Sequence, residues 1–291
     1  MIEPMDPEEL TAARAPVRAN VPPETRMGAV HLTVADLDRS IGYYESQVGL
    51  NVHARESGRA QLGTGGEDLL VLTEEAGARP ADGYSGLFHF ALLVPDRIDL
   101  ARFLAYAARE RVPLAGLSDH FVSEAIYLRY PDGHGIEIYA DRPRELWAGQ
   151  VGTRLTTLPL DTNDLLATLE DPKSEPFDSL PGGTVMGHVH LCVADVEQSI
   201  AYYRDVVGFG LMAQLGDQAA FLSAGGYHHH LGGNTWQSAG RPYAPEGYAR
   251  LTQMTIVLPD EASRGALAER LGGTEVLDPS GIPASLTVGA A

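Results

Sequence analysis

The chain has 291 residues, which suits two compact domains or one pseudo-symmetric pair, each able to bury a core. Its 39 acidic and 21 basic residues give a formal net charge of -18, which argues against a nucleic-acid partner, because phosphate backbones are bound by lysine and arginine. The single cysteine, Cys192, excludes an internal disulfide, and no segment is apolar enough to span a bilayer. We therefore expect a globular protein of the cytoplasm without a membrane partner.

The first predicted elements follow a polar N-terminal arm. Residues 1–25 are rich in proline, glutamate, alanine and arginine and contain no signal-peptide core, so we expect them to be flexible. Residues 28–36 (GAVHLTVAD) then alternate as a strand does and end on an aspartate that can cap a helix. The tyrosine pairs 43/44 and 202/203 have the spacing of helix residues that pack in a core.

A second strand and helix follow in the same half of the chain. Residues 89–96 (HFALLVPD) read as a strand, and residues 98–111 read as the helix behind it. The shorter strand-like runs lie at residues 60–62, 69–72, 125–128, 136–139, 219–222 and 228–231.

Both strand-helix units recur later in the chain. Residues 28–36 return as residues 187–195 (GHVHLCVAD), and residues 89–96 return as residues 253–260 (QMTIVLPD), followed by a helix over 260–271. The repeats predict four modules in two pseudo-symmetric halves of an α+β fold, at about 28–78, 86–141, 187–236 and 250–290. We expect domains at 26–141 and 184–291, joined by a linker over 142–183 with one short helix near 161–170.

Candidate metal ligands are divided unequally among the modules. The second module has His89 early in its first strand and Glu137 in a strand after a tight turn (residues 132–139, DGHGIEIY). The third module has His188 one residue after its glycine, where the first module has Ala29. The fourth has Gln253 and Ser285 where the second has His89 and Glu137. Neither half of the chain is complete by itself, and the fourth module looks degenerate and structural in role.

These motifs, together with residues 227–236 (YHHHLGGNTW), resemble the bacterial tandem catechol 2,3-dioxygenases of the vicinal-oxygen-chelate superfamily. The resemblance covers nearly everything from Met27 onward and implies βαβββ modules whose mixed, curved sheets form open barrels. It also implies His89, Glu137 and His188 as ligands of iron(II), a two-histidine, one-carboxylate set that leaves positions for substrate and O₂. Manganese(II) accepts the same ligands and stays open. The second and third modules must then share one site, within a chain or between chains.

The same resemblance implies the catalytic residues. His229 would be the acid–base residue, as the second histidine of a pair on a strand, and Tyr127, ten residues before Glu137, would hold the substrate oxyanion. His120 would reach a substrate oxygen. The implied reaction is extradiol cleavage of a small aromatic diol with O₂, and a homo-oligomer stays open.

Other histidines have simpler interpretations. We expect His31 and His190 to be core residues or neighbours of the metal ligands, not ligands themselves, and His134 to be a turn residue. His228 and His230 are expected on the face of the strand opposite His229, packed or facing solvent.

Two other functions remain open from the sequence. The first is a metal-free binding protein of the bleomycin-resistance kind, whose acidic surface would suit cationic drugs. The second is a metal enzyme of the glyoxalase kind, which would need a fourth ligand such as Gln253 in the occupied site. Two histidines and one glutamate, with His229 and Tyr127 beside them, favour ring cleavage.

Overall fold

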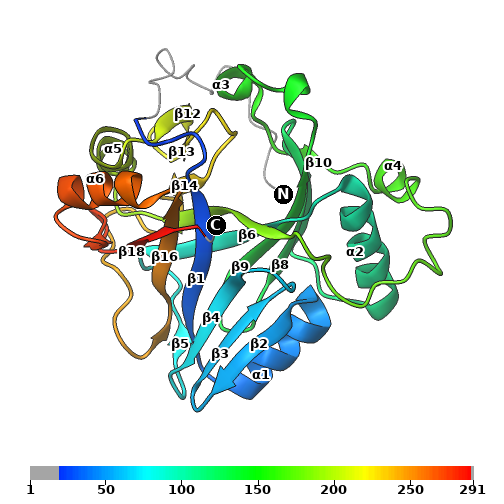
Figure 1. Cartoon of the computed structure of the whole chain (residues 1–291). Coiled ribbons are helices and arrows are strands. Elements are labelled where there is room, and N and C mark those ends of the chain that lie inside the picture. Colours follow the sequence, from blue (N-terminus) through cyan, green and yellow to red (C-terminus); the bar gives the residue numbers. More distant parts are fainter. Residues whose placement is uncertain (1–19, 290–291) are drawn as a thin grey trace.

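The computed structural model describes residues 20–289 and contains four modules, each of which packs a helical segment against a group of strands (Figure 1). The first module comprises β1 (Arg26–Val34), α1 (Leu37–Tyr43), the π-helical turn η2 (Tyr44–Val48), β2 (Asn51–Glu56), β3 (Arg59–Gly63) and β4 (Asp68–Glu74). The second comprises β6 (Gly86–Leu93), α2 (Arg97–Glu110), β7 (Gly116–Asp119), β8 (Ser123–Arg129) and β9 (Gly135–Asp141).

The third and fourth modules repeat this order. The third comprises β11 (Val185–Cys192), α5 (Val196–Ile200), the π-helical turn η4 (Ala201–Val207), β12 (Gly210–Leu215), β13 (Ala219–Ser223) and β14 (Leu231–Asn234). The fourth comprises β16 (Leu251–Leu258), α6 (Glu261–Leu271), β17 (Glu275–Leu277) and β18 (Pro283–Val288). Within the described residues the fourth module is therefore one strand shorter than the others. The predicted α+β class with curved mixed sheets is confirmed.

Aspartates begin the helices as predicted. The side chains of Asp36, Asp195 and Asp260 each accept a hydrogen bond from the backbone N–H three residues later, which satisfies a donor that has no partner inside the helix. The π-helical turns η2 and η4, which continue α1 and α5, end at Gly49 and Gly208, whose φ angles of 88° and 99° favour glycine.

Each of the two large sheets combines strands from both halves of the sequence. The seven-stranded sheet has the order β17-β18-β16-β1-β4-β3-β2 and joins the fourth module to the first. The nine-stranded sheet has the order β10-β7-β8-β9-β6-β11-β14-β13-β12 and joins the second module to the third. The second and third modules thus share one sheet within a single chain. The domains predicted at 26–141 and 184–291 follow the sequence repeat. Each large sheet combines strands from both of these segments, and the division into domains stays a prediction.

The helices lie on the outside of the sheets, with α2 on one side of the molecule and α5 and α6 on the other (Figure 1). One continuous hydrophobic core contains residues of all four modules, among them Leu32, Phe90, Leu191 and Ile256. The tyrosines Tyr44 and Tyr203 are fully buried in this core, as their helical spacing predicts.

The segment predicted as a linker contributes structure of its own. It contains η3 (Arg144–Leu146), α3 (Val151–Arg154), β10 (Leu158–Pro159) and α4 (Thr162–Leu166). The strand β10 pairs with β7 at the edge of the nine-stranded sheet. Trp147 is buried and packs with Val151 and Leu155 in a second, smaller hydrophobic cluster. The segment therefore extends the nine-stranded sheet and contributes a small hydrophobic cluster, in addition to joining the two halves of the chain.

The end of the predicted N-terminal arm is held against the third module. The backbone N–H groups of Asn20 and Val21 donate to the carbonyl oxygen of Gly208, and the Val21 side chain is buried. Residues 1–19 of the predicted arm lie outside the described residues. No helix in residues 20–289 has the length and apolar character needed to cross a membrane.

Candidate metal centre

Three neighbouring strands of the nine-stranded sheet bring His89, Glu137 and His188 together. In the register of β11, β6 and β9, Ala91 lies opposite His188 on one side and opposite Glu137 on the other. His89 is two residues before Ala91 on the same strand, so its side chain points to the same face. Since Ala91 has only a methyl group, the side chains on both sides can lean over it and meet His89.

Two glycines let these strands approach each other. A Cβ atom at Gly135 would lie 2.2 Å from the carbonyl oxygen of Phe88 and 2.9 Å from the Cβ of His89. A Cβ atom at Gly187 would lie 1.9 Å from the hydroxyl of Tyr139. Both distances are far below van der Waals contact. A larger residue at position 135 would push β9 away from β6, and one at position 187 would displace the side chain of Tyr139.

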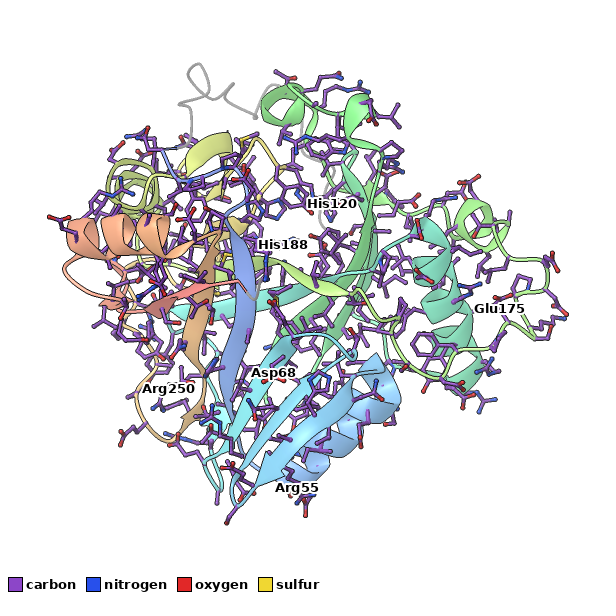
Figure 2. All side chains as sticks on the ribbon, viewed as in Figure 1. Arg55, Asp68, His120, Glu175, His188 and Arg250 are labelled. Carbon is purple, nitrogen blue, oxygen red and sulfur yellow. The ribbon has the colours of Figure 1, made fainter. Side chains whose placement is uncertain are left out.

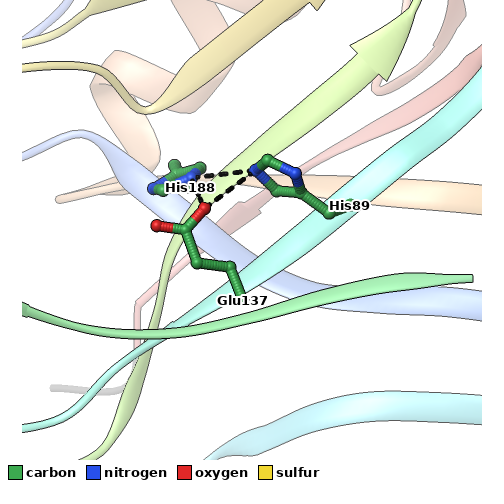
Figure 3. A group of neighbouring side chains, drawn as sticks. All are labelled: His89, Glu137 and His188. Atoms are coloured by element: carbon green, nitrogen blue, oxygen red, sulfur yellow. Dashed lines mark hydrogen bonds and ion pairs between the residues drawn. The ribbon is translucent and has the colours of Figure 1, made fainter. Parts of the chain in front are cut away.

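The three side chains meet through one atom each (Figure 3). Nε2 of His89 lies 3.0 Å from Oε2 of Glu137, and Nε2 of His188 lies 3.2 Å from the same oxygen. The two Nε2 atoms are 3.3 Å apart. All three residues are buried. Among the described residues, no other three histidine, cysteine, aspartate or glutamate side chains bring ligand atoms within 4.8 Å of one another.

The protonation states of this triad suit a metal ion. Burial by itself would raise the pKa of Glu137, but His188 and His89 hold it well below its usual range, so the carboxylate is ionised. Burial lowers the pKa of His188 from 6.5 to about 4, against the opposing effect of Glu137, so this imidazole is neutral at neutral pH. A neutral imidazole and an ionised carboxylate are the forms that bind metals. The donor set therefore fits a divalent transition-metal ion.

Tyr127 and His120 lie beside the triad and are bonded to each other. Tyr127 faces Glu137 across the β8–β9 hairpin, which is why ten residues separate them in the sequence. The carbonyl of Thr156 can only accept, so Nδ1 of His120 donates to it over 2.8 Å, and Nε2 then accepts from the Tyr127 hydroxyl over 2.7 Å. The role of Thr156 was not predicted, because it comes from the segment between the halves.

His229 also lies against the triad, with its ring centroid 4.1 Å from that of His188. The predicted strand at 228–231 is wrong, because β14 begins only at Leu231. Gly225 and Gly226 have positive φ angles, and the turn they form closes when the N–H of Tyr227 bonds to Ala224, so the histidines lie in a loop. Strand alternation does not apply to that loop.

His228 is therefore bonded to His229 instead of facing away from it. Nε2 of His228 lies 2.9 Å from Oδ1 of Asp141, and Nδ1 of His228 lies 2.8 Å from Nδ1 of His229. A carboxylate only accepts, so Nε2 of His228 donates to it. With one proton on the His228 ring, Nδ1 accepts from His229, which leaves Nε2 of His229 without a proton. The role of His228 and Asp141 was not predicted, since no sequence spacing links them.

The triad opens into a cavity of about 430 Å³. Figure 2 shows His188 and His120 in the interior, whereas Arg55, Glu175 and Arg250 lie nearer the edge. His190, expected in the core or beside the ligands, is buried and lines the cavity, with its ring centroid 5.0 Å from that of His89.

The corresponding place in the seven-stranded sheet has no such triad. His31 pairs with Gln253 on β16 as His190 pairs with His89, and Ser285 on β18 corresponds to Glu137. The amide of Gln253 donates to the hydroxyl of Ser285 over 2.7 Å. Gln253 therefore lies in the other sheet and does not complete the ligand set of the triad.

His134 is buried in the turn before β9, and its burial predicts acid sensitivity. Burial lowers its pKa from 6.5 to about 4, against an opposing effect of Asp132. Below pH 6.5 the unfolded chain takes up the proton first, so stability falls as the pH drops from 6.5 towards 4. We expect His134→Gln to remove ~2 kcal/mol of the stability loss between pH 7.5 and 5, measured by urea unfolding at both values. The surface variant His53→Gln is the control, and an unchanged pH dependence in His134→Gln would contradict the assignment.

Comparison with known proteins agrees with the fold and the site. The model of the Glyoxalase/Bleomycin resistance protein/Dioxygenase superfamily matches residues 26–138 and 185–271. The chain belongs to this superfamily. It is also 39% identical to the catechol-2,3-dioxygenase of Bacillus subtilis (strain 168) over 254 residues, which cover 85% of this chain and 88% of that protein. The resemblance stated from the sequence is confirmed, and the protein is an enzyme of the dioxygenase group.

Solved structures of superfamily folds overlie most of the chain. A protein of Bacillus subtilis subsp. subtilis str. 168 has a TM-score of 0.59 at 14% identity and covers 91% of this chain, with 86% of its own chain covered. Glyoxalase I from Zea mays has a TM-score of 0.53 at 20% identity, with coverage of 90% and 92%. At these identities the likeness concerns the fold alone.

Proposed function

We propose that this protein is an extradiol dioxygenase that opens the ring of a catechol with O₂ at a non-haem iron(II) site formed by His89, Glu137 and His188. The reaction breaks the ring bond next to the diol, and both oxygen atoms of O₂ enter the product, a carboxylate with a semialdehyde. The observation that carries the proposal is the contact between two buried imidazoles and one ionised carboxylate on neighbouring strands of the nine-stranded sheet. The likeness to a catechol-2,3-dioxygenase supports the same chemistry.

Iron(II) bound there would supply the coordination positions that bring the diol and O₂ together. The protein supplies three donors and keeps them away from bulk water, because each is less than one-tenth exposed. Manganese(II) accepts the same donors, and loading the protein with each ion separately decides between them. A glyoxalase-like reaction would call for a fourth protein ligand, and Gln253 is bonded to Ser285 in the other sheet.

His229 is proposed to move the proton. Burial lowers its pKa well below 6.5, and the neighbouring His188 acts in the same direction, so His229 begins neutral with its free lone pair on Nε2. It can take the proton from a substrate hydroxyl and return it to the oxygen that leaves when the O–O bond breaks. Tyr127 keeps its proton, because burial and Glu137 raise its pKa well above 10. Its hydroxyl is proposed to turn from His120 to the substrate oxyanion.

The assay follows directly from the reaction. Protein loaded anaerobically with iron(II) is mixed with catechol and then with air. We expect a yellow semialdehyde to form while one O₂ is consumed per catechol. If iron(II) binds tightly but no member of a catechol panel causes oxygen uptake, the proposed function is wrong.

His228 is proposed to position the proton-transfer residue. The bond from His228 to Asp141 decides which nitrogen of His229 carries the proton. We expect His228→Leu to lower kcat about tenfold or more without loss of bound iron, because His229 can then adopt the wrong tautomer.

The conservative variant separates positioning from packing. A glutamine at position 228 can donate to Asp141 and accept from His229, so His228→Gln should recover much of the kcat lost in His228→Leu. Equal kcat values in the two variants would contradict the positioning role. Metal content and thermal unfolding are measured for both, so that a folding defect is recognised.

A further inference from the structure

We propose that the substrate is an uncharged catechol with an apolar substituent, held by an aromatic wall formed by Phe88, His190, Phe221 and Trp236. This inference rests on the proposed ring-cleavage function and specifies its substrate class. It follows from the size of the cavity, the character of this wall and the pairing of every charged group in the lining outside the triad.

The cavity is larger than one ring requires. Its volume of about 430 Å³ lies within the range of sites for drug-sized ligands, roughly 300 to 1,000 Å³. It extends from the triad along β6 to the beginning of that strand, where Tyr84 and Ser85 contribute to the lining. An unsubstituted catechol at the triad would leave much of this space to water. A substituent on the ring would displace that water.

The wall next to the triad is aromatic. The Phe88 ring centroid lies 5.2 Å from that of His190 and 5.3 Å from that of Trp236, with an edge-to-face arrangement in the second pair. His190 lies 5.7 Å from Phe221 on its other side. These are contact distances for aromatic rings. The wall offers an apolar substituent a continuous surface.

Trp236 lies at the end of this wall where it meets solvent. Trp236 is 48% exposed and also lines the cavity, so its indole offers apolar surface at the place where the cavity opens to solvent. A substituent of the bound catechol would cover part of this surface. Complete burial of one methylene-sized group changes affinity about tenfold or more, and the partly exposed wall would bury only part of the substituent.

No cation in the described part of the lining is free to bind a substrate carboxylate. Outside the triad, the charged lining residues are all ion-paired: Arg129 with Asp82, Asp132 with Arg39, and Arg250 with Glu75. The remaining fixed charge is the negative carboxylate of Glu137. A catechol with a carboxylate on its side chain would bury that group beside the negative Glu137 without a partner, which is costly, or would have to compete with Asp82 or Glu75 for an arginine that is already paired.

The test compares three catechols that differ in one substituent. They are catechol, 4-isobutylcatechol and 3,4-dihydroxyphenylacetate; the last two have side chains of nearly the same shape, one apolar and one anionic. Binding to the iron(II)-loaded protein is measured by anaerobic titration calorimetry, so that no turnover occurs. We expect the isobutyl compound to bind about tenfold more tightly than catechol and about a hundredfold more tightly than the carboxylate.

Substitution of the aromatic wall tests where the preference arises. In Trp236→Ala the ratio of isobutylcatechol to catechol affinity should fall to about threefold or less. The matched control is Leu277→Ala, a similarly exposed apolar residue on β17 of the other sheet, which should keep the ratio of the unsubstituted protein.

The outcomes distinguish this inference from the proposed function. If the carboxylate binds as tightly as the isobutyl compound and the catechols are cleaved after air is admitted, the substrate-class inference is overturned and the proposed function stands. If none of the three is cleaved by the iron-loaded protein, the proposed function fails and this inference fails with it. A retained preference in Trp236→Ala would also overturn the role of the aromatic wall.

Discussion

Substituting Glu137 by glutamine is expected to remove stoichiometric iron(II) binding and to lower kcat/KM for catechol by about a thousandfold or more, equivalent to ~4 kcal/mol. Glutamine has the same size and can still contact His89 and His188, but it removes the negative charge that faces the two Nε2 atoms. The fold should survive, because glutamine has the same shape and its amide can still donate to and accept from the neighbouring imidazoles, so that no buried polar group is left without a partner. Metal content, oxygen uptake and thermal unfolding are measured together.

The pseudo-symmetric half of the chain supplies the matched control. Ser285 has the position in the seven-stranded sheet that Glu137 has in the nine-stranded sheet. Its hydroxyl accepts a hydrogen bond from the amide of Gln253. Ser285→Ala should lose one hydrogen bond, at a cost of about 1 kcal/mol of stability, and keep full metal content and activity. If Glu137→Gln binds iron like the unsubstituted protein, the triad is not the metal site.

Substituting His229 by glutamine is expected to lower kcat by roughly a hundredfold to a thousandfold while iron content stays unchanged. His229 contacts His188 through its ring but offers no atom to the meeting point of the triad, so its role is separate from metal binding. Its loss removes the group that takes and returns the proton, and KM should change far less than kcat. Steady-state kinetics with metal analysis on the same preparation measure both quantities.

His230 provides a control from the same loop. Its Nδ1 accepts from the backbone N–H of Ala224 over 3.1 Å, and burial lowers its pKa to about 3, so it is a neutral structural acceptor. His230→Gln keeps an acceptor and should retain kcat within about threefold. A His229→Gln variant as active as His230→Gln would show that the proton comes from elsewhere.

The modules could be predicted from the sequence because they depend on local patterns, and the candidate ligands because the motifs around them resemble those of a known family. The alternation around His31 and His190 specifies strands, the aspartates Asp36 and Asp195 specify where helices begin, and their recurrence specifies a repeat. The unequal distribution of His188, His89 and Glu137 required that two different modules share a site. The structure unites those two modules in one sheet of one chain.

The loop at 227–230 shows where local patterns are insufficient. Three successive histidines are compatible with an alternating strand. Gly225 and Gly226, with positive φ angles, form a turn before them, and the histidines lie in the loop that follows. The bond between His228 and Asp141 joins residues from different modules, and the bond between His120 and Thr156 joins the sheet to the segment between the halves. Neither partner could be found from spacing along the chain.

The sequence by itself determined the four modules, the helix caps and the residue types able to bind a metal, because these follow from periodicity and side-chain chemistry within short segments. Only the tertiary structure decided that β6 lies between β9 and β11, so that Ala91 leaves room for the triad, and that the aromatic wall lines a cavity with paired charges. The physical reason is that strand register and loop packing are set by contacts between distant segments, which no local pattern encodes.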